Sequence, residues 1–220
     1  MIVKLSGPML PPKSGGLPKQ IMVLLHGYGA DGADLIGLGR EWGELWPDML
    51  FVSPNAPEIC ERSAGGYQWF PLNVDRIAGR IEGAATARPI IVSFLMDLWA
   101  QTGLTAADAI LCGFSQGAMM ALHVGTSLDQ ELRAVVAFSG ALIPAEGFLE
   151  ARFAKPPVAL IHGEFDPVVD PDLSRESAQV LADAGFEVRL HISPGVGHGI
   201  APDGLQFATD FLLHQMVAKA

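Results

Sequence analysis

The chain has 220 residues and a formal net charge of −10 at neutral pH, and its 14 lysines and arginines form no basic cluster. This charge would repel nucleic-acid phosphates, so nucleic acid is excluded as an expected partner. A chain of this length is expected to fold as a single domain over residues 1–220 and to bury about 70% of its unfolded surface, without help from a structural metal or disulfide.

Half of the residues are hydrophobic and the mean hydropathy is +0.32, but the apolar residues occur in short runs. The longest run, Pro89–Ala100, contains Asp97 and is too short to span a bilayer. The first residues show no charged segment followed by an apolar segment and a cleavage site, so secretion is not expected. Cys60 and Cys112 do not make a disulfide framework, and Cys112 is expected to be a small buried hydrophobe. We therefore expect a cytoplasmic protein without stable membrane insertion.

In chain order, short apolar runs alternate with segments of helical spacing. An edge strand is expected at Ile2–Leu5, and the Pro/Gly-rich segment from Gly7 to Pro18 is expected to be a loop. Further strands are expected at Ile21–Leu25, Leu50–Val52, Ala109–Cys112, Ala134–Phe138, Val158–Ile161 and Glu187–His191. Helical spacing is clearest at Ile90–Gln101, Gly117–Thr126, Leu173–Ala184 and Leu205–Val217. This alternation predicts an α/β fold with a mostly parallel central sheet and helices on both faces, where ligands bind beyond the carboxyl ends of the strands.

One of these strand ends carries the pattern Gly113-x-Ser115-x-Gly117, between an apolar strand and a helix. In this context the pattern is typical of a nucleophile elbow, where a serine hydroxyl is lifted off the end of the sheet. The N-terminus of the following helix would face a developing oxyanion. The alternative is a chance match, because a chain this rich in glycine would show the five-residue pattern in roughly one random sequence in ten.

A histidine suited to general-base catalysis follows the last expected strand. His198 is bracketed by Gly195, Gly197 and Gly199, which leave its imidazole free to reach across the site. His26 and His162 also follow strands and are alternatives that could line the site, but both precede a glycine, and we expect them to brace loops by hydrogen bonding. The remaining histidines are expected to be structural: His123, His191 and His214.

The acid expected to orient His198 is Asp166, which follows a buried strand directly and is stiffened by Pro167. Asp170 is the second choice, since it is otherwise read as a turn or cap residue, like Asp172. The resulting order of serine, acid and histidine along the chain is that of an α/β-hydrolase triad.

These residues together describe acyl transfer. His198 would accept the proton of Ser115 during attack, and Asp166 would fix the tautomer and stabilise the imidazolium. The backbone N–H groups of Gln116 and Tyr28 would hold the oxyanion. No phosphate-binding glycine motif and no paired metal ligands are found, so no cofactor and no metal is expected.

Four ordered motifs carry a resemblance to a known family: His26-Gly-Tyr-Gly-Ala-Asp-Gly, Gly113-Phe-Ser-Gln-Gly, His162-Gly-Glu-Phe-Asp-Pro-Val-Val and Gly197-His198-Gly. Over residues 18–215 the chain resembles the bacterial carboxylesterase and acyl-protein thioesterase family of small, capless α/β-hydrolases. The resemblance implies the same triad and oxyanion donors. It also implies a small-molecule ester or acylated substrate, with thioesters and lysophospholipids in the family's range, and a homodimer as one assembly that members form. The chain departs from the family at Ala118 and Asp170, where glycine and proline are frequent.

The long connection between Pro54 and Asp75 is the expected specificity element, because long loops in compact domains are usually functional. Trp69, Phe70 and Leu72 are expected to bind substrate as one wall of an acyl groove, and Trp69-Phe70 also resembles a family loop beside the acyl site. The alternative is that these rings only pack the loop onto the body. A hydrolase of the same fold acting on a lactone or peptide bond, or a non-catalytic binding protein, is the competing interpretation of the whole chain.

Overall fold

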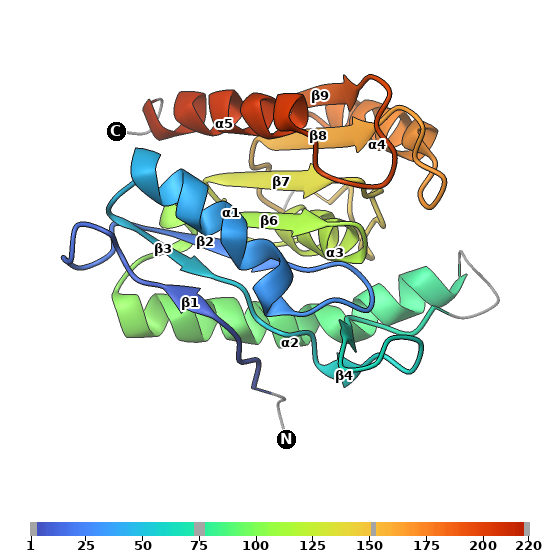
Figure 1. Ribbon diagram of the computed structural model, residues 1–220. Coiled ribbons are helices and arrows are strands. Elements are labelled where there is room, and N and C mark those ends of the chain that lie inside the picture. The colour runs from blue at the N-terminus through green and yellow to red at the C-terminus, as the bar shows by residue number, and fades with distance from the viewer. Residues whose placement is uncertain (1–3, 73–77, 151–152, 218–220) are drawn as a thin grey trace.

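A seven-stranded sheet organises the chain, in the order β1-β3-β2-β6-β7-β8-β9. The computed structural model describes residues 4–72, 78–150 and 153–217 (Figure 1). All neighbouring strands are parallel except β1, which pairs antiparallel with β3. The strands are β1 (Met9–Leu10), β2 (Gln20–Leu25), β3 (Met49–Val52), β6 (Ala109–Phe114), β7 (Ala134–Phe138), β8 (Val158–Gly163) and β9 (Val188–Ser193).

Helices cover both faces of this sheet, which confirms the predicted α/β architecture. On one face lie α1 (Gly32–Leu45) and α5 (Pro202–Val217), and on the other lie α2 (Ala78–Thr102), α3 (Gln116–Gly125) and α4 (Pro171–Asp183) (Figure 1). Alternate residues of β2 supply the two cores: Met22 and Leu24 pack with α1 and α5, while Val23 and Leu25 pack with α2 and α3. Strands buried on both faces explain the continuous apolar runs in the sequence.

The predicted edge strand at Ile2–Leu5 is wrong where it can be judged. Lys4 and Leu5 are not in a strand, and residues 1–3 lie outside the described part of the chain. The edge is instead formed by Met9–Leu10, inside the segment expected to be a loop. Proline lacks an N–H and limits the ladder to two residues here, because Pro8 and Pro11 flank the strand.

Two helices differ from the prediction. Helix α1 was not expected, because its four glycines dilute the helical pattern; Asp31 caps it by accepting a hydrogen bond from the N–H of Ala33 at 2.8 Å. Helix α2 begins at Ala78 instead of at the predicted Ile90. It contains Pro89, the first residue of the longest apolar run in the sequence. Packing of Ala84 and Ala87 into the core holds this first half in place.

No helix in the described ranges is both long enough and apolar enough to cross a membrane. The carboxyl ends of β6, β7, β8 and β9 all point to the same edge of the sheet, on the right of Figure 1. The predicted site residues come from the segments that follow these strands and β2.

Candidate active site

Ser115 occupies a strained turn between β6 and α3. Its backbone has φ 54° and ψ −117°, in a region that residues with a side chain rarely adopt, at a cost of about 1–2 kcal/mol. The N–H of Ser115 donates to the carbonyl of Phe138 on the adjacent strand β7 at 2.8 Å, which holds the turn against the sheet. Strain of this kind at the end of a buried strand is what a nucleophile elbow requires.

The two glycines of the motif are required by close backbone contacts. A Cβ at Gly113 would lie 2.6 Å from the backbone nitrogen of Ala118 and closer still to the carbonyl of Gly117. A Cβ at Gly117 would lie 2.5 Å from the carbonyl oxygen of His26 and closer still to that of Leu25. The elbow therefore fits against both its own helix and the end of β2 only without these side chains.

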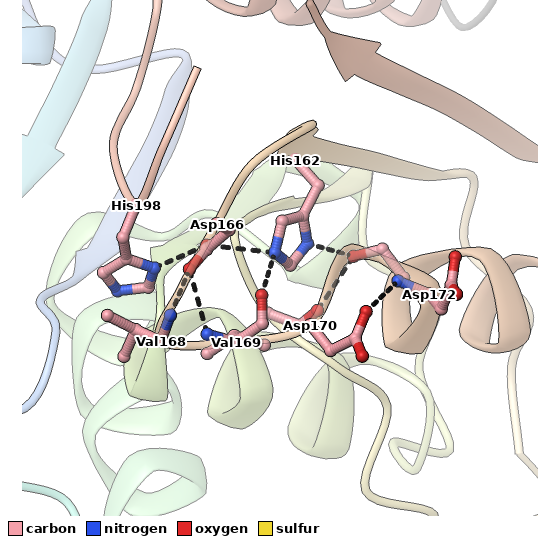
Figure 2. Close-up of polar contacts among 9 residues, drawn as sticks. His162, Asp166, Val168, Val169, Asp170, Asp172 and His198 are labelled. Atoms are coloured by element: carbon pink, nitrogen blue, oxygen red, sulfur yellow. Dashed lines mark hydrogen bonds and ion pairs between the residues drawn. The ribbon is translucent and has the colours of Figure 1, made fainter. Parts of the chain in front are cut away.

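His198 and Asp166 form a short hydrogen bond at the same edge of the sheet. The Nδ1 of His198 lies 2.6 Å from Oδ2 of Asp166, and the Asp166 side chain is fully buried (Figure 2). The two loops that carry these residues are joined by a hydrogen bond from the N–H of Phe165 to the carbonyl of Val196 at 2.8 Å. Since a carboxylate only accepts, Nδ1 carries the proton, and Nε2 of His198 is left to act as the base.

The carboxylate of Asp166 is held in its charged form. Burial by itself would raise its pKa, but hydrogen bonds from His198 and from the backbone N–H groups of Val169 and Val168 outweigh burial and keep the pKa below its ordinary value. Both N–H groups reach Oδ1, at 2.9 and 2.8 Å (Figure 2). A permanently charged acid beside His198 favours the imidazolium that forms during catalysis.

Ring and backbone contacts bring His198 next to the elbow. The imidazole packs on the ring of Phe114, the residue directly before Ser115, with 4.9 Å between the ring centroids. On the other side, a Cβ at Gly27 would lie only 3.4 Å from the Cβ of Ser115. The structure thus gathers at one edge the predicted nucleophile, base and acid together with the glycine turn after β2.

The alternative acid, Asp170, is occupied elsewhere. It caps α4 by accepting the N–H of Asp172 at 3.0 Å, and Pro171 takes the first helical position. This geometry agrees with its reading as a cap residue and favours Asp166 as the acid.

The two expected oxyanion donors have free N–H groups. Within the described residues, neither the N–H of Tyr28 nor that of Gln116 donates to a protein acceptor. His26 orients the first of them: its Nε2 accepts the N–H of Ala56 at 3.0 Å, so its proton is on Nδ1 and is donated to the carbonyl of Gly27 at 2.7 Å. Because the N–H of Tyr28 belongs to the same trans peptide unit, it points away from His26.

A hairpin within the long connection clamps this glycine turn. Its strands are β4 (Glu58–Ile59) and β5 (Tyr67–Gln68). The N–H of Gly29 donates to the carbonyl of Tyr67 at 2.8 Å, and the N–H of Tyr67 donates to the carbonyl of Ala30 at 2.7 Å. The hydroxyl of Ser63 donates to the carbonyl of Gly29 at 2.8 Å.

The side chain of Gln116 ties the elbow to the same connection, a role that the sequence did not reveal. Its Oε1 accepts the N–H of Trp69 at 2.9 Å, and its Nε2 donates to the carbonyl of Phe70 at 2.7 Å. The indole N–H of Trp69 donates to the carbonyl of His26 at 2.9 Å. In the sequence, Gln116 is linked to the site only because it directly follows the nucleophile, and that position predicts a role for its backbone N–H, not for its side chain.

The expected acyl-wall residues differ in exposure. Trp69 and Phe70 are each 1% exposed and belong to the core, whereas Leu72 is 37% exposed. These contacts favour the packing interpretation for the two rings. Residues 73–75, the end of the connection considered in the sequence, lie outside the described residues.

Two of the remaining histidines, and both cysteines, have structural surroundings. His123 is buried and its Nδ1 contacts the carbonyl of Ile143 at 2.7 Å, while His191 pairs with Asp203 at 2.8 Å. Burial lowers the pKa of both His26 and His123, which keeps them neutral. Both cysteines are buried with free thiols, and burial raises the pKa of Cys112.

Comparison with known proteins finds relatives over most of the chain. Residues 13–216 match the model of the phospholipase/carboxylesterase family. Esterase YpfH of Escherichia coli is 31% identical over 88% of this chain and 82% of its own length. Acyl-protein thioesterase 1 of Gibberella zeae is 27% identical over 90% of this chain and 91% of its own length. The crystal structure of esterase PE8 superposes with a TM-score of 0.92 at 54% identity and covers 96% of this chain and 99% of that one.

Proposed function

Because the chain belongs to the phospholipase/carboxylesterase family of α/β-hydrolases, we propose that it is a serine carboxylesterase that works through an acyl-enzyme on Ser115. The observation that carries the proposal is the 2.6 Å hydrogen bond from His198 to the buried Asp166, beside a serine in a strained turn. The esterase and thioesterase relatives support the choice of bond.

The geometry supports a two-step reaction. Oγ of Ser115 attacks the ester carbonyl carbon while its proton passes to Nε2 of His198, and the N–H groups of Tyr28 and Gln116 stabilise the oxyanion. Collapse breaks the bond to the leaving group, which takes the proton from His198. Water then repeats the sequence on the acyl-enzyme and releases the acid. Asp166 stays ionised throughout and stabilises the imidazolium.

We propose short- to medium-chain esters and acyl thioesters as substrates. Apolar side chains beside the site are exposed, with Phe165 at 69% and Val168 at 65%, and both flank the catalytic acid. Each methylene that such a surface covers contributes about 0.8 kcal/mol, so affinity rises with chain length only while apolar surface is available. A thioester needs the same oxyanion donors and has a better leaving group. A cytoplasmic location and a homodimer stay predictions.

A fluorophosphonate probe combined with hydrolysis of butyryl esters and thioesters tests this proposal. Ser115→Ala should lose labelling and several orders of magnitude in kcat while its unfolding transition persists, because the triad acts as a unit. Ser139→Ala is the matched control: Ser139 follows the neighbouring strand with a similar φ of 50°, but it is fully buried. Retained turnover in Ser115→Ala, or loss of labelling in the Ser139 variant only, would contradict the proposed nucleophile.

A further inference from the structure

The carboxylate of Asp166 contacts a second imidazole besides that of His198. Nε2 of His162 lies 3.1 Å from the same Oδ2 atom and 2.9 Å from the carbonyl oxygen of Val169 (Figure 2). The His162 side chain is fully buried at the end of β8, four residues before the acid. Its position between the acid and α4 is not explained by the proposed reaction alone.

The proton on this nitrogen is fixed by its partners. A carbonyl oxygen only accepts, so Nε2 of His162 must carry a hydrogen, which it shares between Val169 and Asp166. Nδ1 lies 2.6 Å from the hydroxyl oxygen of Ser174, which is also 2.9 Å from the carbonyl oxygen of Gly140. The hydroxyl has a single hydrogen, and in the neutral ring it is donated to Nδ1 and not to Gly140. The ring is therefore held on one side by the first turn of α4 and presents a donor to the acid on the other.

The contacts close a ring of hydrogen bonds around the acid. The N–H of Val169 donates to Oδ1 of Asp166, and the carbonyl of Val169 accepts from His162, which also contacts Oδ2 (Figure 2). Rotation of the carboxylate would break bonds at both oxygens. The lone pair of Oδ2 that faces His198 is thereby fixed in direction.

We propose that His162 is a positioning residue for the acid: its neutral Nε2–H orients the carboxylate of Asp166 toward His198 and limits the basicity of that carboxylate. This inference rests on the proposed function only in that His198 is taken as the base. A donor to Oδ2 withdraws charge from the oxygen that His198 uses, so the stability of the His198 imidazolium is set jointly by both histidines.

The surroundings keep His162 uncharged. Burial is the main cause that lowers its pKa; the hydrogen bond to Val169 and the charge of Asp166 act in the opposite direction, and the charge of His198 adds to the lowering. The titratable groups that face it are Asp166 from the loop after β8 and His198 from the loop after β9. From α4 it meets a hydroxyl, while the nearby Asp170 carboxylate is bound to the N–H of Asp172. A neutral ring places no second positive charge beside the His198 imidazolium.

Two substitutions at one position separate this role from packing. His162→Leu keeps bulk but removes the donor, whereas His162→Gln can offer an amide N–H near the position of Nε2. With one donor fewer, Asp166 becomes more basic, so the acid limb of the kcat/KM profile should move to higher pH by about half a unit or more in His162→Leu. His162→Gln should restore most of the wild-type limb. An unmoved limb, a limb at lower pH, or equal shifts in both variants would overturn the proposal.

Helix α4 offers a matched control. Ser174→Ala removes the partner of Nδ1, while Ser177→Ala, one turn later, removes a hydroxyl that donates to the carbonyl of Leu173 and accepts from the N–H of Leu142. Ser174→Ala should move the limb in the same direction as His162→Leu, and Ser177→Ala should leave it in place. Equal shifts in the two serine variants would assign the effect to movement of α4 and overturn the role of His162.

Proton NMR gives a readout that does not depend on turnover. The hydrogen on Nδ1 of His198, bonded over 2.6 Å, should resonate far downfield in the imidazolium form, and His162→Leu should shift that resonance whereas Ser177→Ala should not. If wild type hydrolysed no ester or thioester, the proposed function would fail, yet this resonance would still test the coupling. An identical resonance in wild type and His162→Leu would reject the inference by itself.

Discussion

Gly117→Ala should separate catalysis from folding, because one added methyl group meets the backbone at the end of β2. The Cβ would lie 2.5 Å from the carbonyl oxygen of His26 and closer still to that of Leu25. Carbon and oxygen that are not bonded need more than 3 Å, so the helix start and the strand end must separate by about 1 Å. The residues that move carry the two oxyanion donors, Gln116 on one side and Tyr28 on the other.

The expected free energies differ for the two readouts. Overpacking of this kind costs about 1–3 kcal/mol, and replacing a helical glycine by alanine returns up to about 1 kcal/mol. The net loss of stability is then at most about 3 kcal/mol, or roughly 6–12 °C in Tm for a chain of this size. A displacement of about 1 Å between catalytic donors costs on the order of 100-fold in rate. The fold should survive while kcat/KM falls.

The assay is kcat/KM on a butyryl ester together with thermal unfolding. Gly37→Ala is the control, since Gly37 lies exposed in α1 and a Cβ there meets nothing within 4 Å. That variant should keep wild-type activity and gain about 0.5–1 kcal/mol of stability. If Gly117→Ala kept kcat/KM within twofold of wild type, the close fit of the elbow against β2 would not position the donors.

Two further predictions concern the acid and the response to pH. Asp166→Ala should lower kcat by about 10³- to 10⁴-fold, whereas Asp170→Ala should cost about 1 kcal/mol of stability through the lost cap and leave kcat near wild type; the reverse pattern in a steady-state assay would exchange their roles. The free energy of unfolding should fall on acidification from pH 7.5 to 5.5, because burial lowers the pKa of His26, His123 and His162 in the folded protein. Histidines of the unfolded chain titrate near about 6.5, so the unfolded chain binds up to three more protons than the native state. The slope can then reach about 4 kcal/mol per pH unit in urea unfolding, and a flat profile over this range would show that these histidines are charged in the folded protein.

The sequence predicted those parts of the fold whose pattern is local. Continuous apolar runs identified β2, β6, β7 and β8, and the Gly-x-Ser-x-Gly spacing marked the turn in which Ser115 is strained. Helix α1 was not predicted because its glycines dilute the helical pattern, although Gly39 serves packing: a Cβ there would lie 2.8 Å from the ring of Phe51. Helical propensity is a local property and does not reveal that contact.

The candidate site was likewise predicted in its local features and not in its tertiary contacts. Residue types and order along the chain suggested Ser115, Asp166 and His198, because each follows a strand of the predicted sheet. The contacts of Trp69 could not be read from sequence: the same aromatic residue suits a groove wall or a buried brace, and only the tertiary fold decides. The hydrogen bond from its indole N–H to the carbonyl of His26 joins residues 43 positions apart, so only the tertiary fold reveals it.

The hairpin formed by β4 and β5 combines a backbone that is fixed to the glycine turn with side chains that are exposed. Its backbone is bonded to Gly29 and Ala30, and there a Cβ at Gly66 would lie within 3.0 Å of the Ser63 hydroxyl and closer to the Gly29 backbone. Ile59, by contrast, is 73% exposed, and Glu61 and Arg62 are also exposed. Substitutions of these three exposed side chains can therefore change the surface of the hairpin while its backbone hydrogen bonds to Gly29 and Ala30 stay in place. The hairpin is thus a region whose exposed side chains can vary in sequence while its hold on the glycine turn after β2 is kept.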